Sequence, residues 1–167
     1  IISSKNSKRY NKKIIRVKNE KFFLNQFAYK KRNYTNAKIL AITGSTGKTS
    51  LKNLINNILK KFGKTFCSPK SYNNHFGVPL SLSQLSINDK YGVFEVGMSK
   101  AGEINTLTKL IRPNLAIITN IGEAHIENFK NTKGIAEAKG EIIDNVQKKG
   151  TIILNRDDKY FNYFKKR

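Results

Sequence analysis

The sequence contains very little sulfur: Cys67 is its only cysteine, and there is a single methionine among 167 residues. A lone cysteine excludes an internal disulfide and fits a reducing compartment, so we expect a cytoplasmic protein. Because Cys67 lies in a predicted strand over residues 64–68, we interpret it as a small core residue rather than a nucleophile.

Long hydrophobic runs are also missing. No stretch reaches the roughly 18 apolar residues that a membrane-spanning helix needs, and the mean hydropathy of −0.51 is that of a soluble, rather polar chain. The opening Ile1-Ile2 pair is too short for the apolar part of a signal peptide, and because no methionine precedes it we expect the true start to lie upstream. The length is that of one domain and is enough to bury a core.

Acidic residues are scarce: 11 Asp and Glu stand against 32 Lys and Arg, a formal net charge of +21. Residues 1–38 hold 12 of the basic and one of the acidic residues, and the other 129 residues hold 20 and 10. Basic clusters can bind nucleic-acid phosphates through counterion release. Lys, Asn and Ile are abundant throughout, however, as an AT-rich genome would produce. We therefore favour a compositional bias on a solvated surface over nucleic-acid binding.

Against this background stands a glycine-rich segment that is typical of nucleotide triphosphate binding. The run Thr43-Gly44-Ser45-Thr46-Gly47-Lys48-Thr49-Ser50 directly follows the apolar run Ile39-Leu40-Ala41-Ile42. Glycines let backbone N–H groups close around phosphate oxygens, the lysine reaches the terminal phosphates, and the threonine hydroxyl can bind Mg²⁺. The following helix points the positive end of its dipole at the same anion. We expect residues 44–50 to hold ATP or GTP.

The spacing of this segment departs from the standard phosphate-loop pattern. That pattern has four residues between the first glycine and the Gly-Lys pair, whereas only Ser45 and Thr46 stand there in this chain. The alternative is an ordinary Gly-Ser turn between a strand and a helix. We favour the nucleotide site because an apolar helical pattern follows from Leu51 to Phe62 and ends at Gly63.

Strands and helices are predicted to alternate along most of the chain, which is typical of an α/β fold with a doubly wound, mostly parallel sheet. The predicted strands span residues 14–17, 39–43, 64–68, 91–96, 115–120 and 151–154. The predicted helices span residues 20–31, 48–62, 78–85, 102–111, 132–148 with Thr132 as N-cap, and 157–166. We expect residues 1–13 to be poorly ordered and residues 33–37 to form a linker.

Polar side chains near the ends of these strands are candidates for chemistry, because ligands bind beyond the carboxyl ends of parallel strands. Glu95 lies at the end of an apolar strand and needs a partner, either Mg²⁺ beside the phosphates or a lysine; we favour the metal. His125 follows another strand and is either a ligand, acid or base, or a surface histidine. Asn73 and Asn74 suit either ligand binding or turn formation and capping.

Lys139 falls on the apolar face of the helix predicted over residues 132–148, four residues after Ile135. A buried lysine needs a counter-charge or a changed chemical state. The alternative is that its stem lies along the apolar face while its ammonium reaches solvent at the edge.

Taken together, these segments resemble the ATP-binding central domain of the Mur ligases. The matching runs are residues 42–49, Asn73-Asn74-His75-Phe76-Gly77-Val78-Pro79-Leu80, Glu95-Val96-Gly97-Met98, Gly102-Glu103-Ile104, residues 119–125, Ala138-Lys139-Gly140-Glu141, Leu154-Asn155 and Asp157-Asp158. They cover roughly residues 38–158, and the short phosphate loop is this family's own version. The segments at 73–80 and 102–104 are most similar to the branch that joins D-alanyl-D-alanine to UDP-N-acetylmuramoyl-tripeptide.

The resemblance implies a reaction and a set of roles. ATP phosphorylates the terminal carboxylate of the peptide, and the amine of the second substrate displaces phosphate. Lys48 would bind the β- and γ-phosphates, and Thr49 and Glu95 would bind one Mg²⁺. His125 would help to hold a second Mg²⁺, and Lys139 matches a lysine that the family carries as a carbamate, a carboxylate-like metal ligand. Lys48, Lys139 and His125 would thus be catalytic, and Asn73 and Asn74 would lie near the phosphates.

The resemblance also implies three domains and a monomer when full length. Residues 1–35 would be the tail of the N-terminal UDP-sugar domain with a linker, and residues 36–167 an incomplete ATP-binding domain, so we expect the chain by itself to ligate nothing. Three alternatives stay open. They are another Mur-type ligase or folylpolyglutamate synthetase, a basic nucleic-acid-binding module, and a nucleotide-binding remnant without catalysis.

Overall fold

The protein is described from a computed structural model, which places residues 2–5 and 14–167. Two very short strands, β1 (Ile2–Ser3) and β2 (Ile15–Arg16), pair in parallel near the N-terminus. The main sheet has the strands β3 (Lys38–Thr43), β4 (Thr65–Cys67), β5 (Tyr91–Glu95), β6 (Leu115–Ile118) and β7 (Thr151–Leu154). Its strand order is β4-β5-β3-β6-β7, and every neighbouring pair is parallel.

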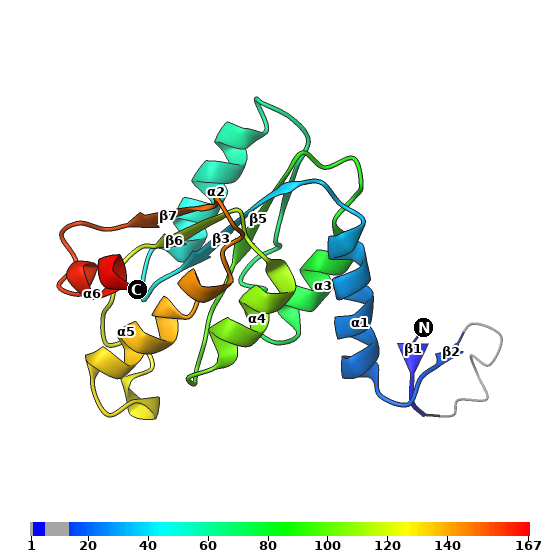
Figure 1. Ribbon diagram of the computed structural model, residues 1–167. Helices are drawn as coiled ribbons and strands as arrows, with labels where there is room; N and C mark the ends of the chain where they lie inside the picture. The colour runs from blue at the N-terminus through cyan, green and yellow to red at the C-terminus, as the bar shows by residue number, and fades with distance from the viewer. Residues whose placement is uncertain (1, 6–13) are drawn as a thin grey trace.

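Helices cover both faces of this sheet, as the alternating pattern predicts (Figure 1). They are α1 (Glu20–Asn33), α2 (Lys48–Leu59), α3 (Gly77–Gln84), α4 (Glu103–Ile111), α5 (Thr132–Gly140) and α6 (Phe161–Lys166), with 3₁₀ turns η2 (Ile126–Asn128) and η3 (Ile143–Asn145). Helix α2 lies on one face, and α1, α3, α4 and α5 lie on the other. The predicted doubly wound α/β fold is thus confirmed.

The two faces of the sheet are unequally covered. The larger core contains Phe94, Ile104 and Ile135, which join β5 to α4 and α5. On the α2 face, the buried apolar cluster of the described residues consists of Ile42, Val93 and Ile117 only. Burial of apolar area is the main stabilising contribution, so most of the folding free energy comes from the face that carries α1, α3, α4 and α5, to which α6 adds Phe164.

Several predicted boundaries were wrong. The helix predicted over residues 132–148 ends at Gly140, where the backbone N–H groups of Glu141 and Ile142 bond three residues back, to Ala138 and Lys139. The carboxylate of Glu141 accepts from the backbone N–H groups of Gly102 and Asn105 at 2.7 and 2.9 Å. The N-cap of this helix is Asn131 rather than Thr132. The helix predicted over 48–62 ends at Leu59, and the one predicted from 157 begins at Phe161.

The first part of the chain is also more structured than predicted. Helix α1 continues through Asn33, two residues beyond its predicted end and one residue into the expected linker. Of the segment 1–13, expected to be poorly ordered, Ile2–Ser3 forms β1, and residues 1 and 6–13 lie outside the described part. Buried Arg32 near the end of α1 donates from Nε to the carbonyl of Ile111 at 2.6 Å and from an NH2 group to that of Arg112 at 3.0 Å. Helix α1 is therefore anchored to the end of α4.

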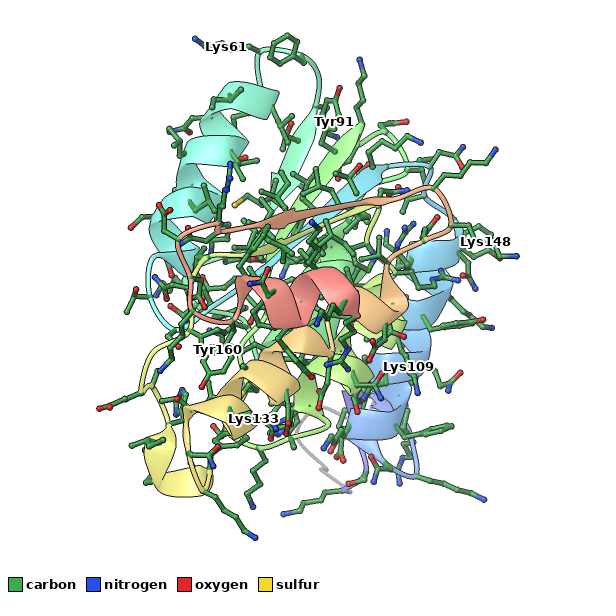
Figure 2. All side chains as sticks on the ribbon, turned by 60° about the vertical axis from the view of Figure 1, so that its left-hand side comes forward. Lys61, Tyr91, Lys109, Lys133, Lys148 and Tyr160 are labelled. Atoms are coloured by element: carbon green, nitrogen blue, oxygen red, sulfur yellow. The ribbon has the colours of Figure 1, made fainter. Side chains whose placement is uncertain are left out.

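Surface charge is widely spread over the described residues. Figure 2 shows Lys61, Lys109, Lys133 and Lys148 projecting outward from four separate parts of the fold. None of the helices in the described segments is long and apolar enough to cross a membrane.

Candidate functional site

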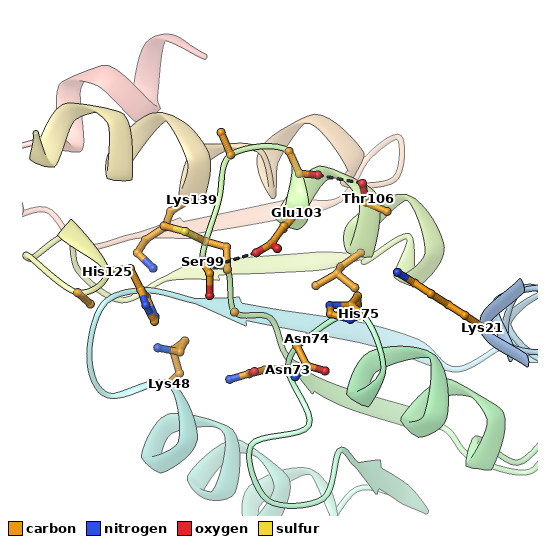
Figure 3. A pocket seen from close by; sticks show the side chains of 16 residues that line it. Lys21, Lys48, Asn73, Asn74, His75, Ser99, Glu103, Thr106, His125 and Lys139 are labelled. Carbon is orange, nitrogen blue, oxygen red and sulfur yellow. Dashed lines mark hydrogen bonds between the residues drawn. The ribbon is translucent and has the colours of Figure 1, made fainter. Parts of the chain in front are cut away.

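A pocket of about 840 Å³ opens where the carboxyl ends of the central strands meet (Figure 3). Lys48 follows β3, Asn73 lies in the loop after β4, and His125 follows β6. Lys139 enters from α5, and Lys21 reaches the opposite end of the pocket from α1. The strand order reverses direction at β3: β4 and β5 lie on one side of it, and β6 and β7 lie on the other. This is where α/β sheets bind ligands.

The glycine-rich loop forms a tight connection between β3 and α2. Gly47 has a φ of 78°, in the left-handed region that favours glycine, and directly precedes the first turn of α2. Gly44 packs so closely on the next loop that a Cβ atom there would lie 1.8 Å from Oγ1 of Thr119. Helix α2 begins at Lys48, which lines the pocket, so the free N–H groups of its first turn lie at that end of the pocket.

Two lysine side chains converge on one carbonyl in this loop. Nζ of Lys48 donates to the carbonyl oxygen of Gly44 at 2.8 Å, and Nζ of Lys139 donates to the same oxygen at 3.1 Å. Lys139 is 2% exposed, so it does not reach solvent at the edge of the helix. In the described part of the chain, neither ammonium has a carboxylate within ion-pairing distance.

Burial changes the pKa of both lysines. It lowers the pKa of Lys139 to about 8, and repulsion from Lys48 acts in the same direction. Burial also lowers the pKa of Lys48, although the nearby Glu95 opposes the change. Two cations held together with lowered pKa values indicate a place for a polyanion.

Glu95 is 2% exposed, and both of its carboxylate oxygens are bound. Oε2 accepts a hydrogen bond from the hydroxyl of Thr49 at 2.7 Å, and Oε1 accepts one from the amide of Asn73 at 2.7 Å. Nζ of Lys52 lies 3.6 Å from Oε2. The lysine partner, which the sequence left as the alternative to a metal, is therefore present.

The donor set around Glu95 still fits a magnesium ion shared with a nucleotide. The described residues contain no group of three or more His, Cys, Asp or Glu side chains that could hold a metal by themselves. Mg²⁺ is normally held by one or two protein oxygens together with phosphate oxygens and waters. The adjacent oxygens of Thr49 and Glu95 match that requirement, since a carboxylate has further lone pairs beyond its present bonds.

The other predicted site residues are Asn73, Asn74 and His125, and each has a different set of contacts. Asn73 binds Glu95, whereas Oδ1 of Asn74 accepts from the backbone N–H groups of Phe76 and Gly77 and so caps the start of α3. His125 has a φ of 65° and is about half exposed, with Nδ1 3.7 Å from a carboxylate oxygen of Glu127. Figure 3 shows His125 beside Lys48 and Lys139.

Sequence reasoning missed two residues that hold this site together. Lys52 is the one fully buried residue of α2, and Nζ donates to the carbonyls of Ser68, at 3.0 Å, and Lys70. Its spacing from Lys48, Ile55 and Leu59 was the available signal, since these positions share one helix face. The second is Asn120, whose side chain binds Thr46 of the phosphate loop.

Comparisons with known proteins agree with this geometry. The family described as "Mur ligase middle domain" matches residues 42–167. A UDP-N-acetylmuramoyl-tripeptide–D-alanyl-D-alanine ligase of Buchnera aphidicola (subsp. Acyrthosiphon pisum) is 42% identical over 99% of this chain and 36% of the relative. Its Escherichia coli counterpart is 37% identical over 85% of this chain and 31% of the relative.

Solved structures give the same result. A crystal structure of MurF from Acinetobacter baumannii superposes with a TM-score of 0.87 at 32% identity, covering 92% of this chain and 34% of that one. MurF ligase from Thermotoga maritima, in complex with ADP, has a TM-score of 0.84 at 28% identity, covering 99% of this chain and 38% of that one. The chain thus spans about a third of the length of these relatives. On these sequence and structural matches, it belongs to the Mur ligase family.

Proposed function

We propose that this chain is the ATP- and Mg²⁺-binding part of a ligase that joins D-alanyl-D-alanine to UDP-N-acetylmuramoyl-tripeptide in peptidoglycan precursor synthesis. The similar relatives carry this activity in their names. Because the chain spans about a third of their length, the ligation itself belongs to a longer protein. Within the chain, residues 36–167 would form the ATP-binding domain and residues 1–35 a tail and linker from a preceding one.

The observation that carries this proposal is the meeting of Lys48 and Lys139 on the carbonyl of Gly44. Holding two ammonium groups so close together without a carboxylate partner is unfavourable unless a polyanion binds between or beside them. A nucleotide triphosphate at the start of α2 supplies that negative charge. An ordinary strand-to-helix turn would give no reason for the second, buried lysine.

The residues around the pocket then take distinct roles. Lys48 binds the β- and γ-phosphates together with the backbone N–H groups of the phosphate loop. Thr49 and Glu95 would hold one Mg²⁺, and His125 with the carbamate form of Lys139 would hold a second. Bound magnesium would neutralise charge on the transferring phosphoryl group. Asn73 orients Glu95 through its hydrogen bond, and Asn74 shapes the loop beside it.

The reaction supported by these roles has two steps. An oxygen of the peptide carboxylate attacks the γ-phosphorus of ATP, which forms an acyl phosphate and releases ADP. The amine nitrogen of D-alanyl-D-alanine then attacks the acyl carbon, phosphate leaves, and the nitrogen loses a proton. The lowered pKa of Lys139 makes a neutral amine available that can add to CO₂, with loss of one proton, to give the carbamate.

Calorimetry with Mg²⁺-ATP tests the nucleotide site. The wild-type chain is expected to bind, and Lys48→Ala is expected to lower the affinity at least tenfold, because it removes the contact to the terminal phosphates. Lys61→Ala is the control, since Lys61 is exposed beyond the far end of α2. A chain that is folded by circular dichroism and binds no ATP would contradict the proposal, as would equal binding by Lys48→Ala.

A further inference from the structure

The phosphate loop is held from outside by the segment that follows β6. The loop has only Ser45 and Thr46 between Gly44 and Gly47, two residues fewer than the standard pattern. The backbone N–H of Ser45 donates to the carbonyl of Asn120 at 2.9 Å. The hydroxyl of Ser45 also donates to the carbonyl of Gly122 at 3.2 Å and accepts from its N–H at 2.8 Å. A short loop is thus fastened to a neighbouring one.

Asn120 makes the most specific of these contacts with its side chain. Its Oδ1 accepts from the backbone N–H of Thr46 at 3.0 Å, and its Nδ2 donates to Oγ1 of Thr46 at 2.7 Å. The hydroxyl of Thr119 donates to the carbonyl of Thr46 at 2.7 Å. Every hydrogen-bonding group of Thr46 is therefore engaged by the segment after β6. Because the N–H of Thr46 already donates to Asn120, the amides from Gly47 onward are those left to bind a phosphate.

Gly44 at the start of the phosphate loop also packs directly against Thr119 and Asn120. A Cβ atom at Gly44 would lie 1.8 Å from Oγ1 of Thr119 and 3.2 Å from the backbone nitrogen of Asn120. The segment is in turn tied to the beginning of α6, because Oδ2 of Asp158 accepts from the N–H of Ile121 at 2.7 Å and Oδ1 accepts from the N–H of Tyr160 at 2.8 Å. The contacts form a continuous connection from α6 to the phosphate loop.

We infer that Asn120 is a positioning residue for the phosphate loop, and that its side chain supplies the conformational restraint that two further loop residues would otherwise provide. The inference rests on the proposed nucleotide site for its functional consequence. Asn120 itself need not touch the nucleotide. By fixing Thr46, it sets the direction of the N–H groups at residues 47–49, so that little loop ordering remains to be done when a phosphate binds.

The test compares Asn120→Ala with Asn88→Ala. Asn88 is exposed in the loop before β5, at the amino-terminal end of that strand and so away from the pocket. Asn120→Ala is expected to weaken ATP binding about tenfold while the thermal unfolding midpoint stays close to that of the wild type. Hydrogen exchange at the Thr46 amide is expected to become at least tenfold faster in the ATP-free chain. A purely structural role would lower the unfolding midpoint and leave the affinity of the folded fraction unchanged.

Asn120→Asp serves as the rescue variant. An aspartate can accept from both the N–H and the hydroxyl of Thr46, so the slow exchange of the Thr46 amide is expected to return. Unchanged ATP affinity or unchanged Thr46 exchange in Asn120→Ala would overturn the inference. If that variant does not fold, Thr46→Val removes the hydroxyl partner and is judged by the same criteria. A folded wild-type chain that binds no ATP overturns the proposed function, and the exchange rates then decide on the loop restraint alone.

Discussion

Nζ of Lys52 lies 3.6 Å from Oε2 of Glu95, and the two side chains are only 1% and 2% exposed. Lys52 comes from α2, directly behind the phosphate loop, whereas Glu95 ends β5. The same ammonium donates to the carbonyl oxygens of Ser68 and Lys70, so one cation joins a helix, a strand end and the loop after β4. The side chain that we propose as a magnesium ligand is therefore held in place before any ligand arrives.

Replacing Lys52 by methionine is expected to destabilise the chain by about 3–5 kcal/mol, because a buried carboxylate and two carbonyls lose their partner. Urea unfolding followed by circular dichroism measures the change. Lys61→Met is the matched control and is expected to stay within about 0.5 kcal/mol of the wild type, since Lys61 is exposed. A loss below about 1 kcal/mol in Lys52→Met would mean that water replaces the ammonium at no great cost.

Gly97→Ala is expected to displace Asn73 from Glu95. A Cβ atom at Gly97 would lie 2.9–3.1 Å from the three terminal atoms of the Asn73 side chain, which is closer than packed atoms allow. The expected cost is about 1–3 kcal/mol in stability, together with weaker Mg²⁺-ATP binding. Gly122→Ala is the control for the stability change, because its Cβ would meet Ser45 at an ordinary 3.6 Å. Mg²⁺-ATP binding by Gly97→Ala equal to that of the wild type would argue that Asn73 does not position Glu95.

The pH dependence of stability should report on Lys139. Its pKa is about 8 in the folded chain against 10.5 for a free lysine. Between these values the unfolded chain binds more protons, so the free energy of unfolding rises with pH. From pH 7.5 to 9.5 the wild type is expected to gain about 2 kcal/mol over Lys139→Met. Urea unfolding of both at the two pH values gives this difference, and parallel behaviour of the two chains would contradict the lowered pKa.

Arg32→Met is expected to cost about 2–3 kcal/mol, because the carbonyls of Ile111 and Arg112 at the end of α4 lose a charged donor. Arg32→Lys should recover only part of this, since an ammonium cannot donate in the fixed fork of a guanidinium. Lys30→Met, on the exposed side of α1, is the control. Chemical denaturation of the three variants measures the effect, and equal stabilities would show that α1 is held by its apolar contacts alone.

Much of the fold was predictable because the apolar patterns of the individual strands and helices match their positions in the folded sheet. The apolar run at residues 39–42 reads as a strand buried on both faces, and it is the central strand of the sheet. The helix over 132–148 was predicted too long because its periodicity continues to Val146. The backbone instead changes to i→i+3 hydrogen bonds after Gly140, and the side chain of Glu141 caps the start of α4.

The apolar pattern of α2 was also interpreted too broadly. Leu54 and Ile58 belong to the predicted apolar face, yet they are 57% and 47% exposed. The apolar residues of α2 spread over a wide arc, so the pattern alone could not tell which part of that arc meets the sheet. Lys52 is buried on the side of α2 that carries Ile55 and Leu59, so the inward face is partly polar.

Residue types and their spacing were enough to identify the groups competent for phosphate chemistry: a glycine-rich turn before a lysine and a threonine, a carboxylate ending a strand, and a lysine on an apolar helix face. Each of these features depends on residues close together in the sequence, so the spacing of residue types reveals it. Only the tertiary structure decided that Lys139 meets Lys48 on one carbonyl, that Glu95 is shared by Thr49, Asn73 and Lys52, and that Asn120 restrains the loop. The separations along the chain run from 22 residues, between Asn73 and Glu95, to 95 residues, between Gly44 and Lys139. Local spacing cannot reveal such pairs, because the packing of the sheet and helices brings them together.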